Sequence, residues 1–273
     1  MKLEILQHKP QNPNQFPPLL FVHGMCHAAW CWQENFMNWF AQKGFTSYAL
    51  SLRNHGKSAS EKSLHQVSLA EYVEDVNQAI DEIGTLPILV GHSMGGLITQ
   101  LYLSEKPAKG AILLAPVPHT GTVSASNNSK LRNTITRWVL LWKKSFLFTM
   151  DTLEKAQKAM YSRDLPMDLL EKYQKAIEDE SIRAYFDMRY PDVPTKYHTQ
   201  IPMLVIAGEK DNLLTVSSIE NTAKYFDASF ILAKNQAHNL MLDTRWEWVA
   251  NQMLVWLETN KEAILSNEKI YSR

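Results

Sequence analysis

The pattern G-x-S-x-G, formed by Gly91, Ser93 and Gly95, is the strongest chemical signal in this sequence. It follows a short apolar run at 87–90 and precedes residues with helical spacing that start at Met94. A sharp strand-to-helix turn exposes a serine hydroxyl above the edge of a sheet, and small residues two positions before and after it leave space for that turn. The run also lacks the lysine of a phosphate-binding P-loop. We therefore predict that Ser93 is a nucleophile.

Attack by a serine on a carbonyl carbon creates a negative oxygen, which needs two preorganised N–H donors. The residue after the nucleophile supplies one donor, here Met94, and the loop after an earlier strand supplies the other. That loop contains His23-Gly24-Met25, so the backbone N–H groups of Met25 and Met94 form the predicted oxyanion hole. In the alternative interpretation, His23-Gly24 only ends a strand.

A serine nucleophile also needs a base that takes its proton, and in this order of elements the base follows the serine near the end of the chain. His238 lies after the last strand candidate and before the last helix, whereas His198 precedes the strand expected at 202–207. We predict His238 as the base.

A carboxylate must hold the tautomer of that base and stabilise its charged form. The turn after the strand expected at 111–115 contains no acid, but the turn after 202–207 offers Glu209 and Asp211. Asp211 is favoured because it lies deeper in the turn, with Glu209 as the alternative.

Strand and helix patterns alternate along most of the chain. Apolar runs predict strands at 3–7, 19–22, 45–50, 87–90, 111–115, 202–207 and 229–232. Helical spacing predicts helices at 32–42, 69–83, 216–226 and 244–258. This alternation indicates an α/β fold with a mostly parallel sheet flanked by helices.

The alternation stops between residues 118 and 190, where several helices are expected without a strand. We therefore predict a core formed by residues 1–117 and 191–273, and a helical cap, or lid, formed by residues 118–190.

Five segments together resemble the α/β-hydrolase superfamily, and more closely its small bacterial esterases, monoacylglycerol lipases and lysophospholipases. They are FVHGM (21–25), LRNHGKS (52–58), GHSMGG (91–96), GEKD (208–211) and AHNLMLD (237–243). The resemblance covers both core segments but not the insertion. It implies an eight-stranded, mostly parallel sheet, a cap over the site and acyl hydrolysis without a cofactor. It also implies a catalytic triad of Ser93, Asp211 and His238.

The stretch HGMCHAAWCW (23–32) is also similar to plant hydroxynitrile lyases and methylesterases. The lyases have a lysine beside the catalytic histidine, where this chain has Asn239, so cyanide-lyase activity is disfavoured. The aspartate-nucleophile dehalogenases and epoxide hydrolases of the superfamily are disfavoured by Ser93.

The insertion contains a run dense in large apolar side chains, including Trp138 and Trp142. These side chains either line an acyl pocket or pack the insertion onto the core, and the two roles are compatible because ligand pockets are mostly apolar. His27 and Trp30, just past the predicted oxyanion loop, are further candidates for substrate contact.

Lys+Arg and Asp+Glu number 28 each and give a formal net charge of +0, so there is no electrostatic reason to expect a nucleic-acid partner; the partner expected from the predicted site is a small-molecule ester substrate. The 2 cysteines, Cys26 and Cys31, match no zinc pattern, so no metal is expected. The N-terminus has no signal-peptide run and no segment has the length of a membrane span, which predicts a cytoplasmic protein. The oligomeric state is left open.

These observations predict a serine hydrolase that cleaves carboxylic esters of lipophilic acyl groups, of the monoacylglycerol lipase or carboxylesterase type. Two alternatives remain. One is a carbon–carbon bond hydrolase or a perhydrolase that uses the same triad, and the other is a non-catalytic small-molecule receptor on this fold.

Overall fold

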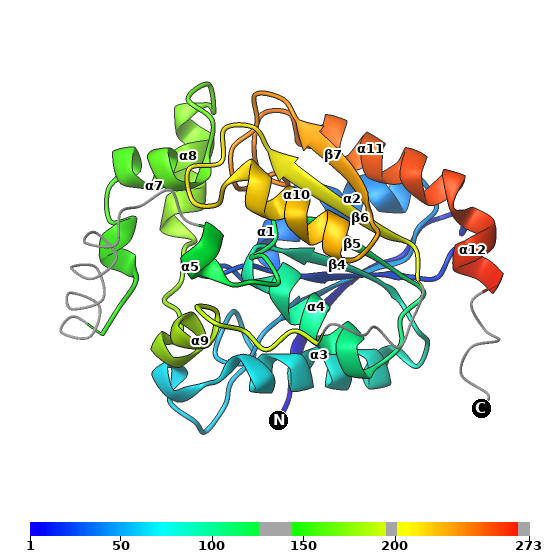
Figure 1. The fold of residues 1–273 in the computed structure, drawn as a ribbon, viewed down its shortest axis with the longest axis horizontal. Coiled ribbons are helices and arrows are strands. Elements are labelled where there is room, and N and C mark those ends of the chain that lie inside the picture. The colour runs from blue at the N-terminus through cyan, green and yellow to red at the C-terminus, as the bar shows by residue number, and fades with distance from the viewer. Residues whose placement is uncertain (126–143, 195–200, 267–273) are drawn as a thin grey trace.

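A seven-stranded, mostly parallel sheet forms the centre of the molecule (Figure 1). The computed structural model describes residues 1–125, 144–194 and 201–266. The strands lie in the order β1-β3-β2-β4-β5-β6-β7. Only β1 is antiparallel to its neighbour. Their bounds are β1 Glu4–His8, β2 Leu19–Val22, β3 Ser47–Ser51, β4 Ile88–His92, β5 Gly110–Leu114, β6 Met203–Gly208 and β7 Ser229–Ala233.

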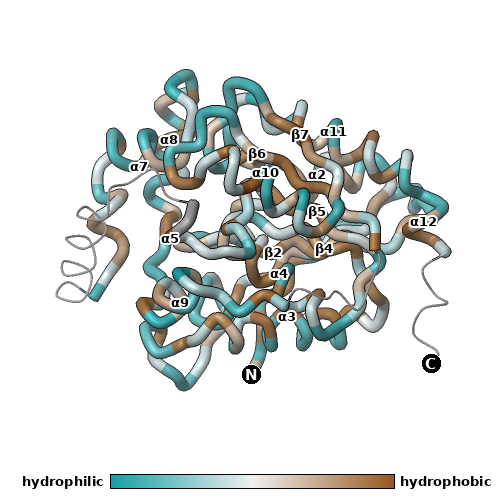
Figure 2. The backbone as a smooth tube through the Cα atoms, in the orientation of Figure 1, coloured by the Kyte–Doolittle hydropathy of each residue, from teal (hydrophilic) through white to brown (hydrophobic). Residues whose placement is uncertain are grey.

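The central strands are apolar throughout because both faces of the sheet are covered. Side chains alternate between the faces, so Phe21 and Val90 belong to one hydrophobic core while their neighbours Leu20 and Leu89 belong to the other. Each such side chain contributes about 1.5–3 kcal/mol when it is fully buried. The central part of the sheet is correspondingly hydrophobic along the tube in Figure 2.

Two sets of helices cover the two faces of the sheet. One core contains apolar side chains of α3 (Leu69–Ile83), α4 (Met94–Glu105) and α10 (Val216–Tyr225). The other contains side chains of α1 (Trp30–Gln33), α2 (Phe36–Gln42) and α11 (Trp246–Thr259), which is followed by α12 (Lys261–Ser266). The sequence predicts an α/β fold with helices on both faces, and this prediction is confirmed.

The structure departs from the sequence-based expectation at the helix predicted for 32–42. The chain forms α1 and α2 instead, with a break at Glu34 and Asn35. Asn35 has φ −134° and ψ −61°, outside the helical region, and its amide donates a hydrogen bond to the carbonyl oxygen of Met241, 3.0 Å away. This bond to a distant loop replaces the helical continuation that local spacing suggested.

The expectation of eight strands is also corrected. In the part of the chain that the structure describes, the sheet has seven strands. A single antiparallel edge strand, β1, precedes β2. The ten residues between them include Pro10, Pro13, Pro17 and Pro18. Proline has no N–H to donate to a strand ladder, so this stretch does not pair as a further strand.

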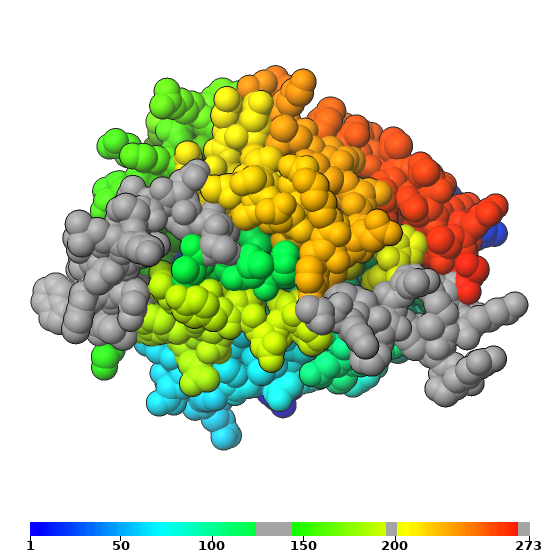
Figure 3. Space-filling model, in the orientation of Figure 1, coloured from blue at the N-terminus to red at the C-terminus, as the bar shows by residue number. Residues whose placement is uncertain are grey.

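Within residues 118–190, the described elements are all helical: α5 (Thr122–Ala125), a 3-10 turn η2 (Leu147–Thr149), α7 (Leu153–Met160), α8 (Met167–Lys175) and α9 (Ile182–Asp187). Side chains of α7 and α8 join one core, and Ala184 of α9 joins the other. In Figure 3 the surface around α9 adjoins the surface of the 3-10 turn η1 (Leu64–Gln66) and α3. Across the described ranges, every helix is too short or too polar to cross a bilayer.

Candidate active site

Ser93 occupies a strained turn between β4 and α4. Its φ of 51° and ψ of −116° lie outside the regions that side-chain-bearing residues favour. The turn is held on both sides of its peptide groups, because the Ser93 N–H donates to the carbonyl of Leu114 at 3.0 Å and the Ser93 carbonyl accepts from the N–H of Val117 at 3.0 Å. A Cβ at Gly95 would collide with the carbonyl oxygens of Val22 and His23, so only glycine allows α4 to approach β2 this closely. This packing maintains the strain.

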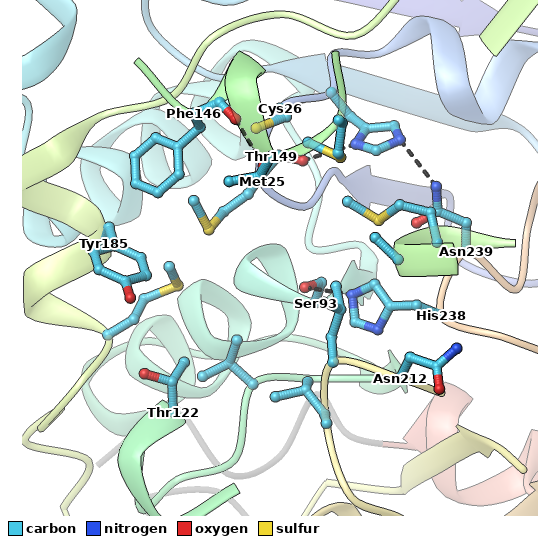
Figure 4. Close-up of a pocket in the computed structure, with 18 of the residues that line it drawn as sticks. Met25, Cys26, Ser93, Thr122, Phe146, Thr149, Tyr185, Asn212, His238 and Asn239 are labelled. Atoms are coloured by element: carbon cyan, nitrogen blue, oxygen red, sulfur yellow. Dashed lines mark hydrogen bonds between the residues drawn. The ribbon is translucent and has the colours of Figure 1, made fainter. Parts of the chain in front are cut away.

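Ser93, His238 and Asp211 lie in one hydrogen-bonded line (Figure 4 shows the first two). The Ser93 hydroxyl oxygen is 2.9 Å from Nε2 of His238, and Nδ1 of the same ring is 2.7 Å from Oδ2 of Asp211. The carboxylate accepts from Nδ1–H, so Nε2 is the nitrogen that accepts from the serine. All three residues are buried.

The Asp211 carboxylate is fixed independently of the histidine. Its Oδ1 accepts hydrogen bonds from the backbone N–H groups of Leu213 at 2.8 Å and Leu214 at 3.0 Å, which leaves Oδ2 for His238. Glu209, the alternative acid, accepts instead from the N–H of Asn235 at 3.0 Å. The structure therefore places Asp211, and not Glu209, against the histidine.

His92, the residue before the serine, also contacts the base, which the sequence did not lead us to expect. Its Nε2 donates to the backbone carbonyl of His238 at 3.1 Å. Complete burial lowers the pKa of His92 well below its usual value, so its ring stays neutral. His92 therefore holds the backbone of the loop that carries His238. Its place inside the G-x-S-x-G pattern is the signal that could have identified it.

His23 orients the peptide that contains the predicted oxyanion donor. Nδ1 of His23 donates to the carbonyl of Gly24 at 2.8 Å, and its Nε2 accepts from the N–H of Leu52 at 3.0 Å. Burial lowers the pKa of His23 to about 3, so the neutral ring keeps one donor and one acceptor. Because a trans peptide is planar, fixing the Gly24 carbonyl turns the Met25 N–H to the opposite side.

His27, a predicted substrate contact, lines the cavity and holds the next peptide. Its Nδ1 donates to the carbonyl of Met25 at 2.7 Å, and its Nε2 accepts from the amide of Asn239 at 3.1 Å. Burial lowers the pKa of His27 to about 4. The ring of Trp30 stacks between His27 and Tyr173, with centroids 5.4 Å and 6.2 Å away, and is not among the described residues that line the cavity.

The backbone N–H groups of Met25 and Met94 are the two predicted oxyanion donors. Within the described residues, neither the Met25 N–H nor the Met94 N–H donates a hydrogen bond to a protein acceptor. Met94 begins α4, so its N–H also lies at the positive end of that helix.

The serine opens into a cavity of about 780 Å³. Its apolar lining consists of Met25, Val117, Phe146, Phe148, Met150, Ala159, Met160, Tyr185, Met188, Leu213 and Leu214. Figure 4 shows Phe146 and Tyr185 on the wall opposite Ser93 and His238. Trp138 and Trp142, predicted to contact substrate, lie outside the described residues. In the described ranges, no three His, Cys, Asp or Glu side chains are grouped as a metal site would require.

Comparison with known proteins places this geometry in context. Residues 17–245 match the protein family described as serine aminopeptidase, S33. The chain is 32% identical over 124 residues to methylesterase 10 of Arabidopsis thaliana, an alignment that covers 42% of this chain and 42% of that relative. It is 26% identical over 221 residues, 78% of each chain, to a protein of Mycobacterium phage D29 described as a non-heme haloperoxidase.

A solved structure has the same fold as this chain over nearly the whole length of both. The monoacylglycerol lipase of Paleococcus ferrophilus superposes with a TM-score of 0.71 at 19% identity, over 95% of this chain and 99% of that chain.

Proposed function

The chain belongs to the serine aminopeptidase S33 family within the α/β-hydrolase superfamily, and from this premise we propose that it hydrolyses carboxylic esters of lipophilic acyl groups. Ser93, His238 and Asp211 are its catalytic triad. The observation that carries the proposal is their hydrogen-bonded line, with 2.9 Å and 2.7 Å between successive partners, at an apolar cavity.

In the first step, Oγ of Ser93 attacks the ester carbonyl carbon while Nε2 of His238 takes the hydroxyl proton. The carbonyl oxygen becomes negative and accepts hydrogen bonds from the N–H groups of Met25 and Met94. Each such donor contributes about 3 kcal/mol to transition-state stabilisation in other enzymes. Collapse of this intermediate breaks the bond to the alcohol oxygen, which receives the proton from His238, and leaves an acyl group on Ser93.

In the second step, His238 takes a proton from water as the water oxygen attacks the acyl carbon. The bond to Oγ then breaks, Ser93 recovers its proton from His238, and the carboxylic acid leaves. Asp211 stabilises the charged imidazole in both steps.

The size and lining of the cavity support the proposal that a lipophilic acyl group of the substrate enters it. Its volume of about 780 Å³ lies within the range of small-molecule sites, and about half of the residues that line it are methionine, aromatic or aliphatic, beside polar groups that include Lys155, Lys158 and Arg189. The described insertion contributes much of this lining, including Phe146, Met150 and Met160. We therefore propose that the insertion at 118–190 is a cap whose described residues form part of the acyl pocket, together with core residues such as Leu213 and Leu214.

The similarity to a haloperoxidase over 78% of each chain favours a second candidate, perhydrolysis. Hydrogen peroxide would then replace water in the second step, so that the acyl group of Ser93 leaves as a peracid. The same residues serve both reactions, and only the nucleophile of the second step differs.

The test is hydrolysis of a series of p-nitrophenyl esters, from acetyl to palmitoyl, by the wild type and by Ser93→Ala, with and without hydrogen peroxide. We expect turnover that is lost in the variant and that is highest with a medium or long acyl chain. Peracid formation in preference to acid would favour perhydrolysis. A folded wild type that cleaves no ester would contradict the proposal and favour carbon–carbon cleavage or a binding role.

A further inference from the structure

Three consecutive acidic residues, Glu178-Asp179-Glu180, lie between α8 and α9, and the first and third of them contact the core. The Glu178 carboxylate accepts from the N–H of Gly56 at 2.8 Å. The Asp179 carboxylate accepts from the N–H of Phe146, a cavity-lining residue, at 2.7 Å. The third member, Glu180, is completely buried, unlike the other two.

Both carboxylate oxygens of Glu180 have partners. Oε1 accepts from the Tyr72 hydroxyl at 2.8 Å and from the N–H of Ser181 at 2.7 Å. Oε2 accepts from the backbone N–H of Cys26 at 3.3 Å and lies 3.3 Å from Nε2 of His55. A carboxylate this deeply buried is stable only when it is paired and hydrogen-bonded, and these four partners meet that requirement.

The contact with Cys26 is notable because that residue directly follows the predicted oxyanion donor. Cys26 has a φ of 63°, in the left-handed region that a cysteine rarely adopts. Its N–H is held by Glu180, and its carbonyl accepts from the N–H of Glu178 at 3.0 Å. The peptide between Met25 and Cys26 is thus fixed at its nitrogen by the insertion, as it is fixed at its oxygen by His27.

We propose that Glu180 is a positioning residue for the oxyanion hole, which acts through Cys26 to hold the Met25 N–H toward Ser93. This inference rests on the proposed function. The peptide before Met25 is oriented by His23 and the peptide after it by Glu180, so both torsions around the Met25 Cα are set. Glu180 belongs to the insertion and lies 154 residues after Cys26 in the sequence. The insertion therefore completes a site on the core.

A glutamine cannot replace this carboxylate without loss. Oε1 and Oε2 each accept from a backbone N–H, of Ser181 and of Cys26 respectively. A carboxamide in either orientation sets its NH₂ against one of these donors and also loses the charge that faces His55.

The experiment compares the full-length wild type, Glu180→Gln and Glu180→Asp in ester hydrolysis. Glu180→Asp keeps the charge but withdraws the carboxylate from Cys26. The matched control is Glu171→Gln on α8, whose side chain is exposed and lies 4.0 Å from Lys175.

Titration with a fluorophosphonate counts the molecules with a reactive serine, so a partly unfolded fraction does not lower the value of kcat. A trifluoromethyl ketone, which forms an oxyanion when a serine adds to it, reports on the hole directly.

We expect Glu180→Gln and Glu180→Asp to lower kcat about tenfold, less than the loss of a whole donor, with KM nearly unchanged. Affinity for the ketone should fall by the same factor, while Glu171→Gln matches the wild type. If the wild type and both Glu180 variants had equal kcat and equal affinity for the ketone, this inference would be overturned but the proposed function would stand. A wild type that cleaves no ester would overturn the proposed function and this inference with it.

Discussion

His55 and Glu180 form an ion pair, with 3.3 Å between Nε2 and Oε2, in which both side chains are completely buried. The pair joins the loop after β3 to the insertion. Burial alone would lower the pKa of His55, but the adjacent Glu180 carboxylate raises it to about 8. The pKa of Glu180 is lowered, because His55 and its hydrogen-bond donors outweigh the effect of burial.

This pair predicts a loss of stability in mildly alkaline solution. The folded-state pKa of His55, about 8, exceeds its ordinary value of 6.5. Its contribution is therefore fully present below about pH 6.5 and is lost as the pH rises through about 8. The shift corresponds to about 2 kcal/mol. Thermal unfolding between pH 6 and 9 should show the wild-type Tm falling by several degrees relative to His55→Gln; parallel curves for the two proteins would contradict the assignment.

The two acids of the turn after β6 should differ sharply in their effect on activity. Asp211→Asn removes the acceptor that fixes the His238 tautomer, so kcat should fall about 10³- to 10⁴-fold. Glu209→Gln is the matched control, because Glu209 contacts the N–H of Asn235 and not the histidine. Steady-state hydrolysis of a short p-nitrophenyl ester measures both. Similar losses in the two variants would remove Asp211 from the triad.

The acyl preference should respond to the volume of the cavity. Ala159 of α7 lines the cavity, and Ala159→Phe fills part of it. We expect kcat/KM for long-chain esters to fall about tenfold or more while acetyl-ester hydrolysis is nearly unchanged. Ala263→Phe, on the exposed side of α12, introduces the same side chain away from the cavity and should have no effect. A uniform loss across all chain lengths in Ala159→Phe would place the acyl chain elsewhere.

The sequence alone determined the local features of this protein. Helix α3 runs over 69–83 as predicted, because Ser68 and Glu71 form a capping box at its start and Gly84 ends it with a φ of 74°. Strand β2 also has its predicted bounds, 19–22. Such signals lie within a few residues of the structure they specify. Membership of the α/β-hydrolase superfamily, predicted from five short segments, is confirmed by the family match over residues 17–245.

The tertiary structure decided what depends on distant partners. Position in the turn favoured Asp211 but left Glu209 as an alternative; only the folded chain brings the Asp211 carboxylate to within 2.7 Å of His238, 27 residues away. The break at Asn35 depends on a carbonyl 206 residues away, and the support of Cys26 depends on Glu180, 154 residues away. A sequence carries no local trace of a partner that only folding brings close, and the buried pairing of Glu180 is therefore visible only in the folded chain.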